Sequence, residues 1–277
     1  MYRDLKYLLA YLLPLAGYLG LYFGGVWSFG SIYVAFVILP LLEFLLPTRT
    51  DEHAPEEESQ RSERRLFDYL LYFNLPILAG AIFYLLYSIT TRNLATYEIT
   101  GMILNVGLLI GTIGINVGHE LGHRTTRGEQ LLAQALLMFG LYMHFFIEHN
   151  RGHHRHVATP LDPATSRKNQ MIYTFWIRST VLSWWHAWVL EAERLGKLNI
   201  SVFSFKNQML RFQLIQLAYL VLVYARFGFT GLWVAIAAAV FGFLMLETVN
   251  YIEHYGLVRR KNTAGRYEPV LPIHSWN

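Results

Sequence analysis

The stretch EITGMILNVGLLIGTIGINVGHELGHR, residues 98–124, joins a long apolar run to a histidine-containing end. A membrane hydrocarbon core about 30 Å thick is crossed by about 20 apolar residues in an α-helix. Residues 98–118 meet this requirement, so we expect a membrane span that places His119 and His123 at its end. Because the two histidines are four residues apart, both imidazoles lie on one face of a continuing helix and can bind a metal there. Taken alone, a pair with this spacing is more often just a polar helix end.

The rest of the chain has the same apolar character. Of the 277 residues, 54% are hydrophobic and 15% are charged, which is typical of a protein that lies largely in lipid. Five further stretches are long and apolar enough to cross a bilayer. We therefore predict an all-α fold, a polytopic membrane helix bundle of six transmembrane helices in a single domain over residues 1–277. The predicted spans are residues 5–25, 27–46, 67–90, 98–118, 209–227 and 230–251.

The positively charged residues predict how these spans are oriented. With the N-terminus inside, 21 of the 23 Lys and Arg residues fall on the inner side, and Arg92 and Arg226 fall outside. Cytoplasmic loops of membrane proteins are enriched in Lys and Arg. The sequence therefore predicts a cytoplasmic N-terminus. The same threading brings residues 119–208 and the end of the last span to the cytoplasmic side.

Two segments between the spans need a separate interpretation. Residues 131–147 are apolar but short, and a crossing there would put two histidine clusters on opposite faces of the membrane. We interpret this segment as a re-entrant, interfacial or buried helix packed under the histidines. Residues 47–65 are acidic and then basic, which predicts a solvated linker in which His53 is an ordinary surface histidine. The sequence shows no signature of nucleic-acid binding.

Two more histidine clusters lie beside apolar segments, EHNRGHH at 148–154 and NYIEHYGL at 250–257. Ionisable groups at the edge of a membrane are functional candidates by default. The three clusters hold more imidazoles than one tetrahedral zinc uses, so a two-metal centre is the simplest interpretation. The chain has no cysteine, which excludes thiolate sites and leaves iron, copper, zinc or nickel open. The candidate metal ligands are His119, His123, His149, His153, His154 and His254.

Three glutamates, Glu120, Glu148 and Glu253, each stand next to a candidate histidine in the sequence. Carboxylates in such positions can bridge metal ions or orient an imidazole through its Nδ1 atom. They can equally face water. We treat the three as candidate site residues.

The motifs HELGHR, EHNRGHH with the following RHVATPLDPATSR, and NYIEHYGL together resemble the membrane-bound alkane 1-monooxygenases of the fatty acid desaturase and hydroxylase superfamily. The resemblance covers nearly the whole chain, including the closing RYEPVLPIHSWN. It implies a non-haem enzyme of the bacterial inner membrane with two iron ions. Such an enzyme uses O₂ and two electrons to hydroxylate the terminal methyl group of a medium- or long-chain alkane. The resemblance makes the six candidate histidines iron ligands and leaves His144, His156 and His186 as supporting or packing residues.

The resemblance also implies rubredoxin and a rubredoxin reductase as electron donors. Residues 119–211 carry eleven basic and six acidic residues, a net charge of +5 that suits an acidic partner. The family's last ligand motif, of the form HxxHH downstream of HSWN, is absent from the 277 residues. We therefore expect a C-terminally truncated chain with weak or no metal binding and no turnover, because an incomplete ligand set positions metal poorly.

Other functions remain open from the residues. HELGH also matches the HExxH pattern of zinc proteases, in which Glu120 would act as the general base and the LDP at 161–163 could add a ligand. A fatty acyl desaturase or hydroxylase, or a methylarene monooxygenase, of the same superfamily would use the same histidines. A metal transporter or another non-catalytic metal-binding membrane protein is a further alternative. A transporter, however, places its ligands near the membrane midplane, whereas these clusters lie at the cytoplasmic ends of the spans.

Overall fold

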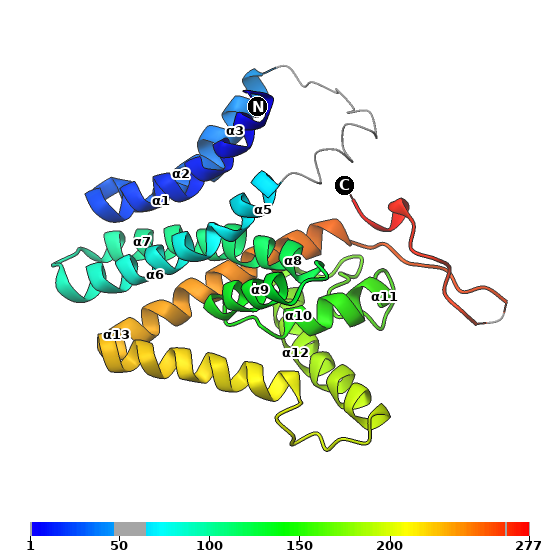
Figure 1. Cartoon of the computed structure of the whole chain (residues 1–277). Coiled ribbons are helices and arrows are strands. Elements are labelled where there is room, and N and C mark those ends of the chain that lie inside the picture. The colour runs from blue at the N-terminus through cyan, green and yellow to red at the C-terminus, as the bar shows by residue number, and fades with distance from the viewer. Residues whose placement is uncertain (1, 47–64, 264, 277) are drawn as a thin grey trace.

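The computed structural model describes residues 2–46, 65–263 and 265–276 (Figure 1). These residues form helices and connecting segments, with an isolated β-bridge between Lys261 and Tyr267. The predicted all-α class is confirmed. Of the predicted linker, residues 47–64 lie outside the described residues, and His53 with them.

The chain begins with an N-terminal hairpin, residues 2–46, whose turn is held by buried polar contacts. The Asn105 side chain of α7 (Thr96–Leu109) accepts a hydrogen bond from the Ser31 backbone N–H and donates one to the Gly17 carbonyl, both at 2.9 Å. In Figure 1 the two arms lean away from the other helices. The elements of the hairpin are η1 (Tyr2–Tyr11), α1 (Leu12–Phe23), η2 (Gly25–Phe29), α2 (Gly30–Tyr33), η3 (Val34–Ile38) and α3 (Leu39–Leu45).

Three long helical units form the centre of the molecule and lie side by side (Figure 1). Large apolar side chains that are fully buried between them include Leu78, Leu85 and Met102. Burial of such side chains stabilises each by about 1.5–3 kcal/mol relative to exposure to water. The units are α5 (Arg65–Tyr72) with α6 (Asn74–Thr91), then α7 with η4 (Ile110–Asn116) and α8 (Val117–Gly122), and finally α13 (Gln208–Glu253).

Four of the described helices are long and apolar enough to cross a membrane: Gly25–Leu45, Arg65–Thr91, Thr96–Gly122 and Gln208–Glu253. The predicted number of six spans is not confirmed. The helix Tyr7–Phe23 is apolar but shorter, and the last two predicted stretches are joined in α13. Gly228 interrupts α13 with φ 66°, a conformation that glycine adopts readily. The chain doubles back there, and each arm of α13 carries one of the two predicted stretches (Figure 1).

The region between α8 and α13 forms one end of the molecule. Residues 131–147 do not make one helix, because a turn with Leu141 at φ 53° separates α9 from α10. Leu136 and Leu137 of α9 are fully buried, and Leu137 packs against Gly118 of α8. The segment packs against the helix that carries the first histidine motif, and its re-entrant, interfacial or buried character stays a prediction. The helices of this region are α9 (Arg127–Phe139), α10 (Phe145–Glu148), η5 (His149–His153), α11 (His154–His156) and α12 (Ile172–Lys197), and η6 (Pro272–His274) follows α13.

Candidate metal centre

The first histidine motif lies at the end of the helical unit formed by α7, η4 and α8, as the sequence predicts. His119 lies in α8, and His123 is the residue that ends this helix. Their Nε2 atoms are 2.8 Å apart. Just before α8, the unit widens into the π-helical turn η4, a geometry that is frequent at functional sites.

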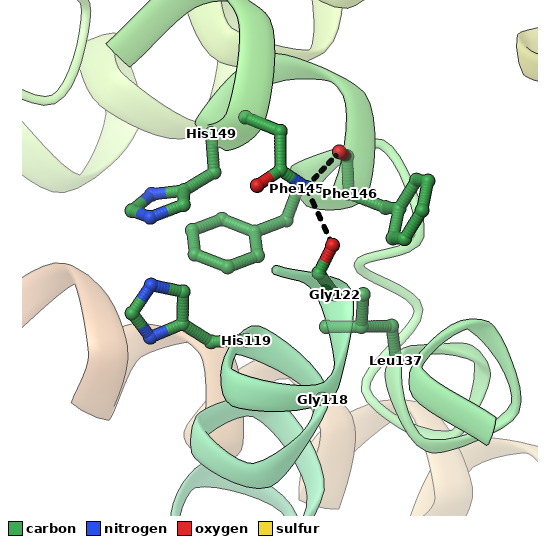
Figure 2. Close-up of a pocket in the computed structure, with 8 residues that line it drawn as sticks. Gly118, His119, Gly122, Leu137, Phe145, Phe146 and His149 are labelled. Carbon is green, nitrogen blue, oxygen red and sulfur yellow. Dashed lines mark hydrogen bonds between the residues drawn. The ribbon is translucent and has the colours of Figure 1, made fainter. Parts of the chain in front are cut away.

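The second motif faces the first from another π-helical turn, η5, which follows α10 directly. The rings of His119 and His149 lie opposite each other with centroids 4.3 Å apart (Figure 2). Phe145 stacks on His149 with a centroid distance of 4.6 Å and so fixes the plane of that ring. From α11, His154 brings its Nε2 atom to 3.4 Å from that of His123. Two motifs with 23 residues between them therefore form one site.

Four of the imidazoles fit a nitrogen-ligated metal ion. Ligand nitrogens of His119, His123, His149 and His154 all lie within 4.8 Å of one another. Among the described residues, the buried Nε2 atom of His149 has no hydrogen-bond partner. Such an atom is costly unless it binds something. Burial, and then the neighbouring histidines, lower the pKa of His149 well below its usual value, so the ring is neutral and able to bind a metal.

The other two candidate ligands extend this cluster to one side. The His153 ring lies 5.1 Å from that of His149 and 5.0 Å from that of His254, measured between centroids. All six candidate histidines thus form one continuous cluster, which we call the histidine cluster. Their role as metal ligands stays a prediction.

Asp162 orients His153. Its Oδ2 atom lies 3.0 Å from His153 Nδ1, and it also accepts hydrogen bonds from the Thr165 hydroxyl and the Ala164 backbone N–H. Burial alone would lower the pKa of His153, but the charge and hydrogen bond of Asp162 outweigh burial and raise it. Since Nδ1 is occupied by the carboxylate, Nε2 is left for a metal, the arrangement found for many ligand histidines.

The segment after the second motif, residues 157–171, ties this arrangement to the end of α13. The Ser166 hydroxyl donates to the Tyr251 carbonyl at 2.7 Å, and the Ser166 carbonyl accepts from the Gly256 N–H at 3.1 Å. On the other side of His254, its Nδ1 atom lies 3.3 Å from the His274 carbonyl of η6. The third motif is therefore held in place from two directions.

The three candidate glutamates have different surroundings. Glu120 is exposed and forms an ion pair with Arg124 at 3.1 Å. Glu253 accepts a hydrogen bond from the Ser275 hydroxyl at 2.9 Å. Glu148 is buried, and its Oε1 atom lies 3.1 Å from Nδ1 of His186. Of the three, Glu148 is the one enclosed beside the histidine cluster, and burial raises its pKa.

The remaining histidines lie around the cluster. His144 is buried against Tyr142, with ring centroids 4.3 Å apart, and the His156 ring lies 6.2 Å from that of His186. The contacts of Asp162 with His153 and of His274 with His254 are not among those expected from the sequence. The available signal was position, because both residues lie inside the quoted motifs ATPLDPATSR and HSWN.

An apolar cavity of about 1270 Å³ separates the N-terminal hairpin from α5, α6 and the unit α7–η4–α8. Its volume exceeds the roughly 300–1,000 Å³ of most ligand pockets. It reaches His119 and Glu120, so one end of the cavity adjoins the histidine cluster. Apolar residues from both sides line it, among them Leu13, Ala16, Ile38, Leu42, Leu71 and Ile113.

The chain is similar to known membrane enzymes. Residues 99–277 match the model of the fatty acid desaturase family. The chain is 37% identical over 270 residues to an alkane 1-monooxygenase of Pseudomonas putida, which covers 95% of this chain and 67% of that protein. It is 36% identical over 279 residues to an alkane 1-monooxygenase of Ectopseudomonas oleovorans, covering 98% and 69%. It is also 31% identical over 277 residues to the xylene/toluene monooxygenase hydroxylase component XylM of Pseudomonas putida, covering 99% and 71%.

The apolar helices and these relatives identify an integral membrane protein, and the histidine cluster lies within the part matched by the family model. The relatives are oxidoreductases, which favours an oxidoreductase over the protease and transporter alternatives for the histidine motifs. The chain belongs to the fatty acid desaturase family of membrane enzymes and, within it, is a relative of the alkane 1-monooxygenases.

Proposed function

We propose that the chain is a non-haem di-iron monooxygenase that hydroxylates the terminal methyl group of medium- or long-chain alkanes. The observation that carries the proposal is the contact between two parts of the structure. A cluster of imidazoles with converging nitrogen atoms adjoins an apolar cavity at His119. The first part suits a redox-active metal centre, and the second suits a substrate with no polar group.

We propose the six histidines of the cluster as iron ligands. All-nitrogen ligation suits iron, and six imidazoles exceed the needs of one zinc ion. Two bound iron ions would supply O₂ activation and C–H cleavage. One oxygen atom of O₂ would be inserted into the C–H bond. The other would be reduced to water, which consumes two electrons and two protons. Among the carboxylates, we propose that Glu148 supports the cluster, whereas Glu120 and Glu253 make contacts at its edge.

The protein side chains bind the substrate and determine its position. Each CH₂ group that leaves water for the apolar cavity contributes about 0.8 kcal/mol to binding. Because the cavity meets the cluster at His119, an extended chain lying in it presents its end to the metal site. The apolar walls also keep water away from the reacting carbon. Attack at the terminal carbon follows from this placement, since an alkane offers no polar group for recognition.

We propose rubredoxin, served by a rubredoxin reductase, as the electron donor. The net charge of +5 over residues 119–211 supports an acidic partner on the side of the histidine cluster. We further propose a single domain over residues 1–277 in a bacterial inner membrane. The distribution of Lys and Arg supports a cytoplasmic N-terminus and a cytoplasmic metal site.

A methylarene is the second candidate substrate, because XylM is 31% identical over 99% of the chain. Both substrates are apolar and would occupy the same cavity. They differ in length, and the elongated alkane makes fuller use of a cavity of about 1270 Å³.

The test is product analysis with purified protein in nanodiscs, supplied with iron, rubredoxin, the reductase and NADH. Octane, p-xylene and a fatty acid are offered separately, and iron per chain is measured on the same sample. If the iron-loaded protein turns over, we expect 1-octanol to be the main product and to disappear in the His149→Ala variant. His156→Ala is the control, since this histidine lies outside the cluster. Oxidation of p-xylene alone by the iron-loaded protein would reassign the substrate, and iron binding unaffected by His149→Ala would reject the metal site.

A further inference from the structure

Helix α12 exposes one apolar face along most of its length. The exposed side chains recur every four residues, which places them in one row on an α-helix. Between residues 171 and 189, every exposed position except Thr174 is apolar. We call the following residues the outer row: Tyr173, Ile177, Val181, Trp185 and Val189.

The opposite face of α12 packs against the protein and carries smaller and more polar residues along its middle, between the buried Phe175 and Leu195. Ser179, Ser183 and Ala187 are buried there, and Glu191 continues this row one turn later. A helix on the surface of a water-soluble protein has the reverse pattern, with apolar residues inside and polar residues outside. Small residues between packed helices and large apolar residues outside are typical of helices surrounded by lipid. The side-chain pattern of α12 therefore favours lipid on its outer face.

The position of α12 in the chain supports the same conclusion. Its 26 residues are long enough to cross a membrane but not apolar enough, and ten residues separate its end at Lys197 from the start of α13 at Gln208. In that connecting loop, Phe203 and Phe205 are 90% and 76% exposed. A loop that leads directly into a span lies at the membrane surface, and aromatic residues are enriched there.

Tryptophan is concentrated in α12. Four of the seven tryptophans of the chain belong to this helix: Trp176, Trp184, Trp185 and Trp188. Trp prefers the boundary between headgroups and acyl chains, because its ring is apolar and its N–H is polar. One turn after the outer row ends, the exposed position is Glu193, and Lys197 follows. The apolar face is thus limited to the part of the helix that precedes these charges.

We propose that α12 lies in the plane of the membrane, with its outer row inserted at the boundary between headgroups and acyl chains of the leaflet on the side of the histidine cluster. The bilayer is the same one that the spans cross. After the charged end of α12, Phe203 and Phe205 place the connecting loop at the same headgroup boundary before α13 begins. This inference uses the membrane location of the protein and is independent of its substrate and metal.

The in-plane helix also forms a wall of the candidate metal centre. Its inner face contributes His186, which contacts Glu148, and the buried Glu191, which binds Arg151 of η5 at 3.0 Å. A Cβ atom at Gly152 would lie 2.9 Å from the His186 ring, so α12 packs closely on the turn that carries the second motif. Lipid contact on one face of α12 therefore holds its other face against the histidine cluster.

The test uses the absence of cysteine from the chain, because a single introduced cysteine can be spin-labelled without background. Labels are placed at Ile177, Val181 and Trp185 in the full chain in nanodiscs. Accessibility to O₂, which concentrates in lipid, is compared with accessibility to a nickel chelate, which stays in water. Leu217, exposed on the first arm of α13, is the lipid reference, and Thr263 near the C-terminus is the aqueous reference.

We expect all three outer-row labels to favour O₂ as Leu217 does, and a label at Glu193 to favour the nickel chelate as Thr263 does. Nickel accessibility at the outer row equal to that of Thr263 would overturn the proposal. Spin–spin broadening between fully labelled chains at Trp185, absent on dilution with unlabelled protein, would also overturn it, because a second copy would then cover the face.

A second measurement leaves the outer row nearly intact. Fluorescence quenching by brominated lipids is compared between the unmodified protein and the Trp184→Phe/Trp185→Phe variant. The difference between them reports these two tryptophans, and we expect stronger quenching by bromines near the headgroup than by bromines at the chain ends. No quenching of the difference signal by either lipid would contradict the proposal.

Discussion

The histidine cluster and the N-terminal hairpin differ in how strictly the positions of their side chains are fixed. In the cluster, His153 contacts the Asp162 carboxylate and His254 contacts the His274 carbonyl. Beside the cluster, the buried Glu191 of α12 binds Arg151 of η5. The arms of the hairpin face the cavity with apolar side chains, and the described polar contacts of the hairpin gather largely near its turn. The comparison shows where this protein needs exact geometry and where it needs only apolar volume.

The difference follows from the interactions involved. Metal ligation and hydrogen bonds are directional, so an error in the position of a ring removes most of the interaction. Transfer of apolar groups out of water depends on area and has no preferred direction. Substitutions in the cluster should therefore have large, all-or-none effects, and substitutions in the cavity wall should have graded ones.

Removal of a central imidazole is expected to have the largest effect. His149→Ala removes the ring that contacts both His119 of the first motif and His154 of the second. We expect metal affinity to fall more than about 100-fold, beyond the range seen for indirect partners of metal ligands. Anaerobic metal titration followed by absorbance measures this. His156→Ala should bind metal like the unchanged protein. Equal metal affinity of the His149→Ala and His156→Ala variants would mean that the histidine cluster is not the metal site.

Asp162→Asn tests whether the cluster depends on orientation as well as on ligands. The amide keeps the shape of the carboxylate but loses its charge, so the hold on His153 Nδ1 weakens. We expect metal affinity to fall about 10–100-fold with unchanged helix content. The same titration, with circular dichroism as a check on folding, measures it. Asp68→Asn, at a more exposed ion pair, is the matched control; an effect of similar size there would argue against a specific role of Asp162.

Glu191→Gln tests the buried ion-pair network beside the cluster. Burial alone would raise the pKa of Glu191, but Arg194, the Gln208 N–H and Arg151 outweigh it and lower the pKa below 4.5. The ionised carboxylate therefore stabilises the fold above this pH, and the stabilisation is lost as the pH falls through the lowered pKa. At neutral pH we expect the variant to be destabilised by roughly 1–3 kcal/mol, measured as a lower unfolding midpoint in detergent.

The control for this variant is Glu193→Gln, an exposed position two residues further on, where we expect a change within about 0.5 kcal/mol. The difference between Glu191→Gln and the unchanged protein should shrink as the pH is lowered below 4.5. A difference that stays constant over this range would mean that the charge of Glu191 is not responsible.

Leu39→Trp tests the cavity side of the comparison and should have the smallest, graded effect. Leu39 lines the cavity, so a larger ring there shortens the space for an extended chain. Each CH₂ group that no longer fits costs about 0.8 kcal/mol of binding, or about fourfold in affinity. Competition between alkanes of different length measures the shift toward shorter substrates. Leu41→Trp, exposed two residues away and outside the cavity lining, should leave the preference unchanged. The same chain-length preference in both variants would mean that the substrate does not bind in this cavity.

The sequence alone determined the all-α class, the apolar helices and the three histidine motifs. These features depend on local information, since apolar run length and the four-residue spacing in HELGHR act within a single helix. The packing of residues 131–147 near the histidines could also be predicted, because a crossing there would have separated the motifs. The number of six spans is not confirmed, because the helix Tyr7–Phe23 is shorter than a span and the last two predicted stretches lie on the two arms of one helix bent at Gly228.

Only the tertiary structure decided which partners the site residues have. Asp162 reaches His153 through a turn, and the His274 carbonyl reaches His254 across 20 residues, contacts that no periodicity encodes. The same holds for Glu148, which lies beside His149 in the sequence but binds His186 of α12. The cavity exists because the hairpin is fixed at its turn and diverges from the central helices. Such features arise from packing between distant segments, where shape and burial, and not local pattern, set the free energy.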